Sequence, residues 1–240
     1  MRYQFTRTAT AFIAIASTLA ATACSAGSST TGTSTGSGGK NEALSIGLVA
    51  EPSNLDFTKT DGAAIPQVLL NNVYEGLVKL NNSGEIIPDL ATAWKVSTDR
   101  LTYTFDLVAG AKFSNGQTFS AEDAAFSINQ VKTNWTVSLK KSMDVVKEAK
   151  AVTPTQLQVT LSKPSNDWLY RMTTRVGAMF SKTGVDKLAT DPIGTGPYSL
   201  KTWKRGDSIS LQRNDSYWGT KPFFQTVDFK YFKDTTALNH

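Results

Sequence analysis

The sequence has almost none of the side chains on which most protein metal sites and nucleophilic catalysts depend. Its 240 residues include one histidine, His240, and one cysteine, Cys24. A zinc centre built from His and Cys needs several such ligands, and a Ser-His-Asp or Cys-His pair needs a histidine within the folded body. A single cysteine cannot form a disulfide within the chain. The composition excludes sites of these kinds, and we expect neither a cofactor nor a metal centre.

The sequence also lacks a block of charge of either sign. The formal net charge is +5, and two basic residues, Arg2 and Arg7, fall in an N-terminal segment that we expect to be removed. The remaining basic excess is spread along the chain, whereas nucleic-acid binding needs clustered basic residues. Hydrophobic residues make up 40% of the chain and aromatic residues 10%, which is enough to build a core. We therefore expect a folded protein that does not bind nucleic acid.

The N-terminus has the features of a secretion signal. A basic start is followed by ATAFIAIASTLAATA, residues 9–23, which is apolar and too short for a comfortable membrane-spanning helix. Residues 21–24, ATAC, resemble a bacterial lipobox, although Ala21 stands where leucine is usual. The sequence therefore predicts a signal peptide over residues 1–23 and a lipid on Cys24, which becomes the first mature residue.

Small polar residues follow this cysteine. The stretch 25–39, SAGSSTTGTSTGSGG, contains only Ser, Thr, Gly and Ala and cannot bury a core. Residues 24–40 are thus predicted to be a lipidated cysteine and a flexible linker. Such a tether would hold a globular domain on the extracellular or periplasmic face of the cell membrane.

The body alternates between strand and helix patterns. We expect helices at 64–77, 120–131 and 167–171, and strands at 43–49, 101–107, 145–152, 157–161, 198–203, 208–212 and 227–232. Ser120 is expected to cap the second helix, because acidic residues follow it in the first turn. Another helix would begin near Thr235 and has room for about one turn. The sequence therefore predicts a chain that is truncated at its C-terminus.

The turn GTGPY, residues 194–198, resembles a phosphate-binding loop only superficially. A dinucleotide-binding turn needs a third glycine and a following helix, whereas Pro197 and a predicted strand follow here. We expect the two glycines to adopt positive φ angles, in a stiff loop that either faces a ligand or only directs the strand. Asn214, Tyr217 and Trp218 likewise either face a ligand or close the edge of a core.

Two long segments carry a family resemblance. These are LATAWKVSTDRLTYTFDLVAGAKFSNGQTFSAEDAAFSI, residues 90–128, and residues 192–234, which contain GTGPY, RNDSYW and VDFKYFKD. With EPSNLD at 51–56 and YEGL at 74–77, they resemble the family 5 extracellular solute-binding proteins. These proteins are the dipeptide, oligopeptide and nickel receptors of ABC importers. One departure is VAG at 108–110, where the family often has a basic residue and a glycine.

The resemblance implies an α/β fold. Family members are about twice as long as this chain, so it implies lobe one of a type II periplasmic-binding-protein-like fold, with a small extra α+β domain and the second lobe missing. Lobe one would comprise residues 41–75 and 181–240, the second part being truncated, and the small extra domain would comprise residues 76–180.

The resemblance also implies a function and a site. In the family, a solute binds between two lobes that close by a hinge motion and then present a surface to a permease. The expected role is a lipid-anchored, monomeric receptor that delivers peptides or similar small solutes, with nickel, opines and sugars left open. The predicted ligand contacts are Glu51, Ser53, Asn54, Leu55 and Tyr198. Glu51 is equally suited to cap a neighbouring backbone.

Two other classes of function remain to be compared. A two-carboxylate hydrolase is disfavoured, because the adjacent Glu122 and Asp123 would point about 100° apart on a helix whose start already explains them. A surface lipoprotein with a structural or adhesive role, or a non-functional fragment, is the alternative to a solute receptor. We do not expect an enzyme.

Replacing Cys24 tests the predicted anchor. Cys24→Ser removes the sulfur that would carry the acyl chains, each buried methylene of which contributes about 0.8 kcal/mol to membrane binding. The variant is expected to move from the membrane fraction to the soluble fraction, while Ser25→Ala stays with the membrane. Retention of the Cys24→Ser protein in the membrane fraction would contradict the anchor.

Overall fold

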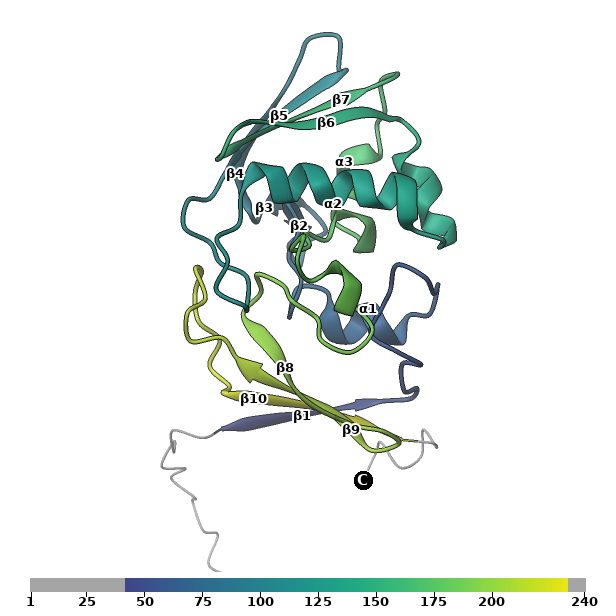
Figure 1. The fold of residues 1–240 in the computed structure, drawn as a ribbon, viewed down its shortest axis with the longest axis vertical. Helices are drawn as coiled ribbons and strands as arrows, with labels where there is room; N and C mark the ends of the chain where they lie inside the picture. The colour runs from purple at the N-terminus through teal and green to yellow at the C-terminus, as the bar shows by residue number, and fades with distance from the viewer. Residues whose placement is uncertain (1–41, 233–240) are drawn as a thin grey trace, which may run out of the picture. The chain divides into compact units, whose positions relative to one another are not determined.

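The computed structural model describes residues 42–232. The predicted signal peptide, Cys24, the linker and the helix near Thr235 lie outside the described residues. The described part belongs to one compact unit and contains two separate four-stranded sheets and one two-stranded hairpin, as Figure 1 shows. The mixed α/β character expected from the sequence is confirmed.

The first sheet joins the two ends of the described chain. Its order is β1 (Ala43–Leu48), β10 (Thr226–Tyr231), β9 (Ser208–Arg213) and β8 (Tyr198–Lys204). β1 pairs in parallel with β10, so that Ile46 lies opposite Phe229, and the other pairs are antiparallel. The purple and yellow ribbons of Figure 1 lie side by side for this reason. The predicted hairpin of β8 and β9 is confirmed, with Gly206 at a positive φ of 75° in its turn.

The second sheet is antiparallel and comes from the middle of the chain. Its order is β4 (Ala91–Val96), β5 (Thr102–Leu107), β7 (Gln156–Leu161) and β6 (Val146–Thr153). Tyr103, Phe105 and Leu107 are buried and alternate with less buried neighbours, as the sequence predicted. α2 (Ala121–Asn134) packs against β6 and β7. The smaller elements are β2 (Val78–Leu80), β3 (Ile86–Pro88), α3 (Trp168–Arg171) and short 3₁₀ helices at 138–143, 175–177 and 185–187.

The start of α2 confirms the predicted cap. The Asp123 carboxylate accepts hydrogen bonds from the backbone N–H of Ser120 at 3.0 Å and from its hydroxyl at 2.9 Å. The Asp123 side chain is buried, and one of its carboxylate oxygens accepts both of these bonds at the start of the helix. This arrangement gives the acidic pair at 122–123 a structural explanation.

The helix expected over residues 64–77 is shorter than predicted. α1 spans only Ala64–Leu69, because the backbone becomes extended at Leu70 and Asn71 adopts a left-handed φ of 62°. The Asn72 side-chain amide donates to the carbonyl of Val68 at 2.9 Å and satisfies the end of the helix. Val73 and the apolar residues after it lie in a turn and are buried there. Their spacing along the sequence therefore suggested a longer helix.

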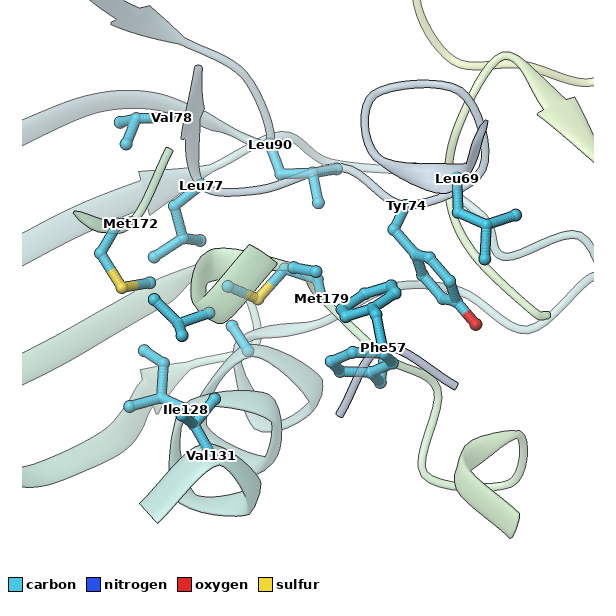
Figure 2. Close-up of a cluster of buried hydrophobic side chains, with 14 of the residues drawn as sticks. Phe57, Leu69, Tyr74, Leu77, Val78, Leu90, Ile128, Val131, Met172 and Met179 are labelled. Carbon is cyan, nitrogen blue, oxygen red and sulfur yellow. The ribbon is translucent and has the colours of Figure 1, made fainter. Parts of the chain in front are cut away.

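The core connects the loop after β1 with the middle of the chain. Figure 2 shows Phe57, Tyr74 and Met179 packed together near the end of α1. The Phe57 ring meets Tyr74 edge-on at a centroid distance of 5.4 Å and Trp135 at 5.7 Å. Edge-to-face contacts of this kind stabilise a core beyond the area that they bury. The segment that follows residues 51–56 is therefore anchored rigidly.

The glycines of GTGPY have a different role from the one predicted. Neither Gly194 nor Gly196 has a positive φ, so the conformational explanation was wrong. They are needed because a Cβ at Gly194 would lie 1.9 Å from the Val73 carbonyl oxygen, and one at Gly196 2.4 Å from the Asn72 oxygen. The N–H of Gly196 donates to Val73 O and that of Tyr198 to Asn72 O, each at 2.9 Å. The turn thus lies directly against the backbone at 72–73.

The predicted boundaries 41–75, 76–180 and 181–240 remain predictions. The first sheet draws only on residues 43–48 and 198–231, and the second only on residues 91–161. The main chain also links the middle segment to the glycine turn, since Ser114 N donates to Gly194 O at 2.8 Å.

A substitution at the glycine turn tests this close packing. Gly194→Ala is expected to lower the free energy of unfolding by about 3 kcal/mol or more, because the added methyl group meets backbone that cannot rotate away. Gly62→Ala is the matched control, since its Cβ would meet only the Thr60 side chain at 3.4 Å. Urea denaturation of both variants gives the comparison, and equal stabilities would show that the turn is not tightly packed.

Candidate functional site

The loop after β1 borders a cavity of about 400 Å³. Residues 49–53 form one side, and residues 60–67, which lead into α1, contribute the other side. Most lining side chains are small or apolar, and Ser53, Thr60 and Gln67 add neutral polar groups. A cavity with apolar walls and a few polar groups is the usual form of a small-molecule site.

Glu51 fastens this loop to the tip of the β8–β9 hairpin. One carboxylate oxygen accepts a hydrogen bond from Trp203 Nε1 at 3.2 Å, and the other accepts one from the backbone N–H of Gly206 at 2.9 Å. The Arg205 guanidinium lies 3.7 Å away. The capping role that the sequence left open for Glu51 is therefore present. A direct ligand contact by Glu51 remains a prediction.

The three following residues occupy different environments. Ser53 is exposed beside the cavity. The Asn54 side chain accepts from the N–H of Asp56 at 2.7 Å and so shapes the loop. Leu55 has no exposed surface, and its N–H donates to Ala189 O at 3.2 Å. Ser53 is thus the best placed of the three for a ligand, and the contacts predicted for all three remain predictions.

Tyr198 belongs to a neighbouring cavity, which shares Val49 and Gln67 with the first. It lines a different cavity, of about 550 Å³, whose walls come mainly from β1 and β10 with Gln67 and Asn72. Its side chain is 7% exposed, and its hydroxyl donates to the carbonyl of Phe224 at 2.9 Å. Of the five predicted residues, the structure brings Glu51 and Ser53 together at the first cavity and places Tyr198 elsewhere.

Arg205 braces the loop at the cavity from outside, and the sequence analysis did not identify it. Its guanidinium stacks on the Trp203 ring at 3.5 Å, and its Nη1 donates to the carbonyl of Ser53 at 2.9 Å. The only signal in the sequence was the basic bend KRGD at 204–207. Nothing in the residue spacing indicated that this bend meets the loop at 51–53.

A second polar cluster surrounds Glu75, whose side chain is almost fully buried. Its carboxylate accepts hydrogen bonds from the Tyr217 hydroxyl at 2.5 Å and from Trp218 Nε1 at 2.8 Å. The ring pair at 217–218 therefore secures the segment after β9 to the core, as the packing interpretation expected. Asp89 lies nearby and pairs with Lys79 at 2.9 Å.

Burial controls the ionisation of this cluster. It raises the pKa of Glu75 to about 7, with the negative charge of Asp89 adding to the rise and the bonds from Tyr217 and Trp218 opposing it. Burial also raises the pKa of Asp89, and Lys79 opposes that rise. Within residues 42–232 there is no group of three or more His, Cys, Asp or Glu side chains arranged to hold a metal ion.

Comparison with known proteins identifies the family. Residues 85–240 match the family model described as bacterial extracellular solute-binding proteins, family 5 Middle. The chain belongs to this family. The resemblance noted in the sequence is thereby confirmed. Family 5 members are extracellular or periplasmic transport receptors rather than enzymes. No helix within residues 42–232 combines the length and the apolar character needed to cross a bilayer.

Two family 5 relatives come from Escherichia coli K12. The nickel-binding periplasmic protein is 34% identical over 176 residues, which cover 69% of this chain and 33% of the relative. The dipeptide-binding protein is 29% identical over 208 residues, which cover 75% of this chain and 38% of the relative. The chain therefore spans between 33% and 38% of the length of these curated relatives.

Solved structures of the family share the fold. DppA from Helicobacter pylori, in complex with the peptide STSA, superposes with a TM-score of 0.76 at 24% identity and covers 83% of this chain and 44% of that one. NikA from Brucella suis, in complex with Fe(III)-EDTA, superposes with a TM-score of 0.70 at 29% identity. The match covers 82% of this chain and 41% of NikA. The periplasmic-binding-protein fold class expected from the sequence is confirmed, over part of the length of those structures.

The Glu75 cluster predicts a dependence of stability on pH. The pKa of Glu75 rises from an ordinary 4.5 to about 7 on folding, so its contribution to stability is complete below about 4.5 and is lost as the pH rises through about 7. This pKa difference corresponds to about 3 kcal/mol. Glu75→Gln keeps the shape and stays neutral, so its free energy of unfolding should fall less than that of the wild type between acid and alkaline pH.

Urea denaturation at about pH 5 and about pH 8 provides this measurement. Glu148→Gln, which removes an exposed carboxylate of β6, is the matched control and should keep the wild-type pH dependence. An unchanged pH dependence in Glu75→Gln would show that Glu75 does not ionise in this range.

Proposed function

We propose that this chain is part of a solute receptor that is anchored to the membrane through a lipid on Cys24. It delivers peptides or similar small solutes to the permease of an ABC importer on the extracellular or periplasmic side. The family membership supports the receptor role. The residues at 21–24 support the anchor.

The observation that carries this proposal is the cavity beside the loop at 49–53. It lies at the carboxyl end of β1, where the loop is fixed by Glu51 and by the core residues that follow it. Ligands of open α/β sheets bind at the carboxyl ends of strands. A rigid loop can therefore present its backbone and Ser53 to a solute without a large ordering cost.

Peptides are the solute class that we favour. Relatives include a dipeptide-binding protein and glutathione-binding proteins, and the Helicobacter pylori structure holds the peptide STSA. Other similar proteins are named for nickel, and one solved structure holds agropinic acid. Apart from Glu51, the lining of the cavity is apolar or neutral and polar, which suits a peptide main chain with small side chains.

The mechanism that follows is closure of two lobes around the solute. The residues described here supply one wall of the solute-binding cleft. The second wall would come from a region that the relatives have and that lies outside their match to this chain. A single wall leaves a bound solute in contact with water, so charge-assisted hydrogen bonds are weakened. Residues 24–240 are therefore expected to bind peptides weakly.

Nuclear magnetic resonance of ¹⁵N-labelled residues 24–240 tests this expectation. Dipeptides and tripeptides in the millimolar range should shift the backbone amide signals of the non-proline residues at 49–53 and 60–67, while signals of the second sheet, residues 91–161, serve as an internal control. A micromolar or tighter Kd would contradict the proposal that one wall is missing.

The same experiment addresses the alternative of a structural or adhesive surface lipoprotein. Peptides, a nickel–histidine complex and a sugar are titrated separately. If none of them shifts the amide signals around the cavity, the receptor proposal fails and the structural role is favoured. If only the nickel complex does so, the solute class changes and the receptor role stands.

A further inference from the structure

One connection of the first sheet is fastened to the body of the protein through a single side chain. Residues 214–225, here called the strap, join β9 to β10 and contain no helix or strand. In the middle of the strap, residues 217–221, only Tyr217 and Trp218 form hydrogen bonds with described residues outside the strap. Both donate to the Glu75 carboxylate. The position of this part of the strap therefore depends on Glu75.

The strap also forms one wall of a cavity of about 330 Å³. Its contribution to the lining consists of four side chains, Tyr217, Thr220, Lys221 and Pro222. The charged groups that the body of the protein adds are Glu75, Lys79 and Asp89. Movement of the strap away from the body would therefore bring the two buried carboxylates of this cavity into contact with water.

These two carboxylates have different partners. Asp89 lies 2.9 Å from the Lys79 ammonium and accepts from the N–H of Gly76 at 3.3 Å, so its negative charge is compensated. Glu75 accepts from a phenol and an indole, which are neutral, and it forms no ion pair with a lysine or arginine of the described range. A buried charge without a counter-ion, beside a second negative charge, is costly. Glu75 is therefore the group of this pair that holds a proton.

Loss of this proton would place a second negative charge in the cavity. Burial and the charge of Asp89 raise the pKa of Glu75 to about 7, so the loss takes place near neutral pH. The other charged groups of the cavity are Lys79 from β2 and Lys221 from the strap. Burial raises the pKa of Tyr217 above its ordinary value, so this hydroxyl keeps its proton. Hydration of the new charge requires water to enter, and the strap is the wall that depends on Glu75 itself.

We propose that Glu75 and the strap form a proton-dependent latch, in which the strap closes over the cavity while Glu75 is protonated and moves away when the proton is lost. This inference goes beyond the proposed receptor function and does not depend on it. The opening is local, because the ends of the strap have bonds of their own. Asn214 Nδ2 donates to the carbonyl of Gly196 at 3.3 Å, and the Tyr198 hydroxyl donates to that of Phe224 at 2.9 Å.

Fluorine NMR of residues 24–240 labelled with 5-fluorotryptophan tests the latch. The chain has five tryptophans, and Trp218→Phe identifies the Trp218 signal. Between about pH 5 and about pH 9 this signal should change with a midpoint near pH 7. Its difference between H₂O and D₂O, which measures contact of the ring with water, should increase at least about twofold on the alkaline side. The signal of the fully buried Trp168 is the internal control and should not change.

Three variants assign the effect to the carboxylates. Glu75→Gln cannot ionise and should keep the closed-state signal over the whole range, because its amide oxygen still accepts from Trp218. Asp89→Asn removes the neighbouring negative charge and should move the midpoint at least about one pH unit lower. Glu85→Gln removes an exposed carboxylate from the turn between β2 and β3 and should keep the wild-type midpoint.

Several outcomes would overturn the latch. One is a Trp218 signal that does not change with pH, or that changes without a gain in contact with water. Another is a wild-type pH dependence in Glu75→Gln, and a third is an unchanged midpoint in Asp89→Asn. If Glu75→Gln does not fold, which its Trp168 signal would reveal, the wild-type titration and the Asp89→Asn midpoint still decide the question.

Discussion

The structure depends on the contact between the glycine turn at 194–196 and the backbone at 72–73. Two main-chain hydrogen bonds join these segments, and no side chain fits between them at Gly194 or Gly196. This contact brings the strands that follow the turn next to the segment that ends α1. The same approach places the rings of Tyr217 and Trp218 within reach of Glu75. A close backbone contact therefore sets the position of both the first sheet and the buried carboxylate.

The loop beside the cavity illustrates how one charged side chain, Glu51, can organise a site through hydrogen bonds within the protein. Glu51 accepts from an indole and from a backbone N–H, which fix its orientation. Arg205 is held by the same constellation and retains unused donors at its exposed edge. Among the residues described, Glu51 anchors the loop, and Arg205 beside it is an exposed cation in the same hydrogen-bonded cluster. The Asn54 and Leu55 contacts maintain the loop shape that places this cluster at the cavity.

The sequence predicted those features that depend on neighbours along the chain. The alternation at 101–107 and the cap at Ser120 are local patterns, and the structure contains both. β4 was not expected, because the Ala91–Val96 strand lacks regular alternation of burial. The end of α1 was misplaced because buried residues continue at helical spacing after Asn71 changes the backbone direction. The hydrogen bonds that Tyr217 donates to Glu75 and Arg205 donates to Ser53 join distant residues, and single-sequence spacing carries no information about such pairs.

The parallel pairing of β1 with β10 has a consequence for the order of folding. The second sheet and α2 come from one continuous stretch, so their contacts close short loops and can form early. β1 is among the first described residues, and its partner is among the last, so the first sheet must close a loop that contains almost the whole domain. A ribosome or an export channel therefore releases β1 long before its partner. During that interval the backbone N–H and C=O groups with which β1 pairs to β10 have no partner strand and are open to pairing with other chains.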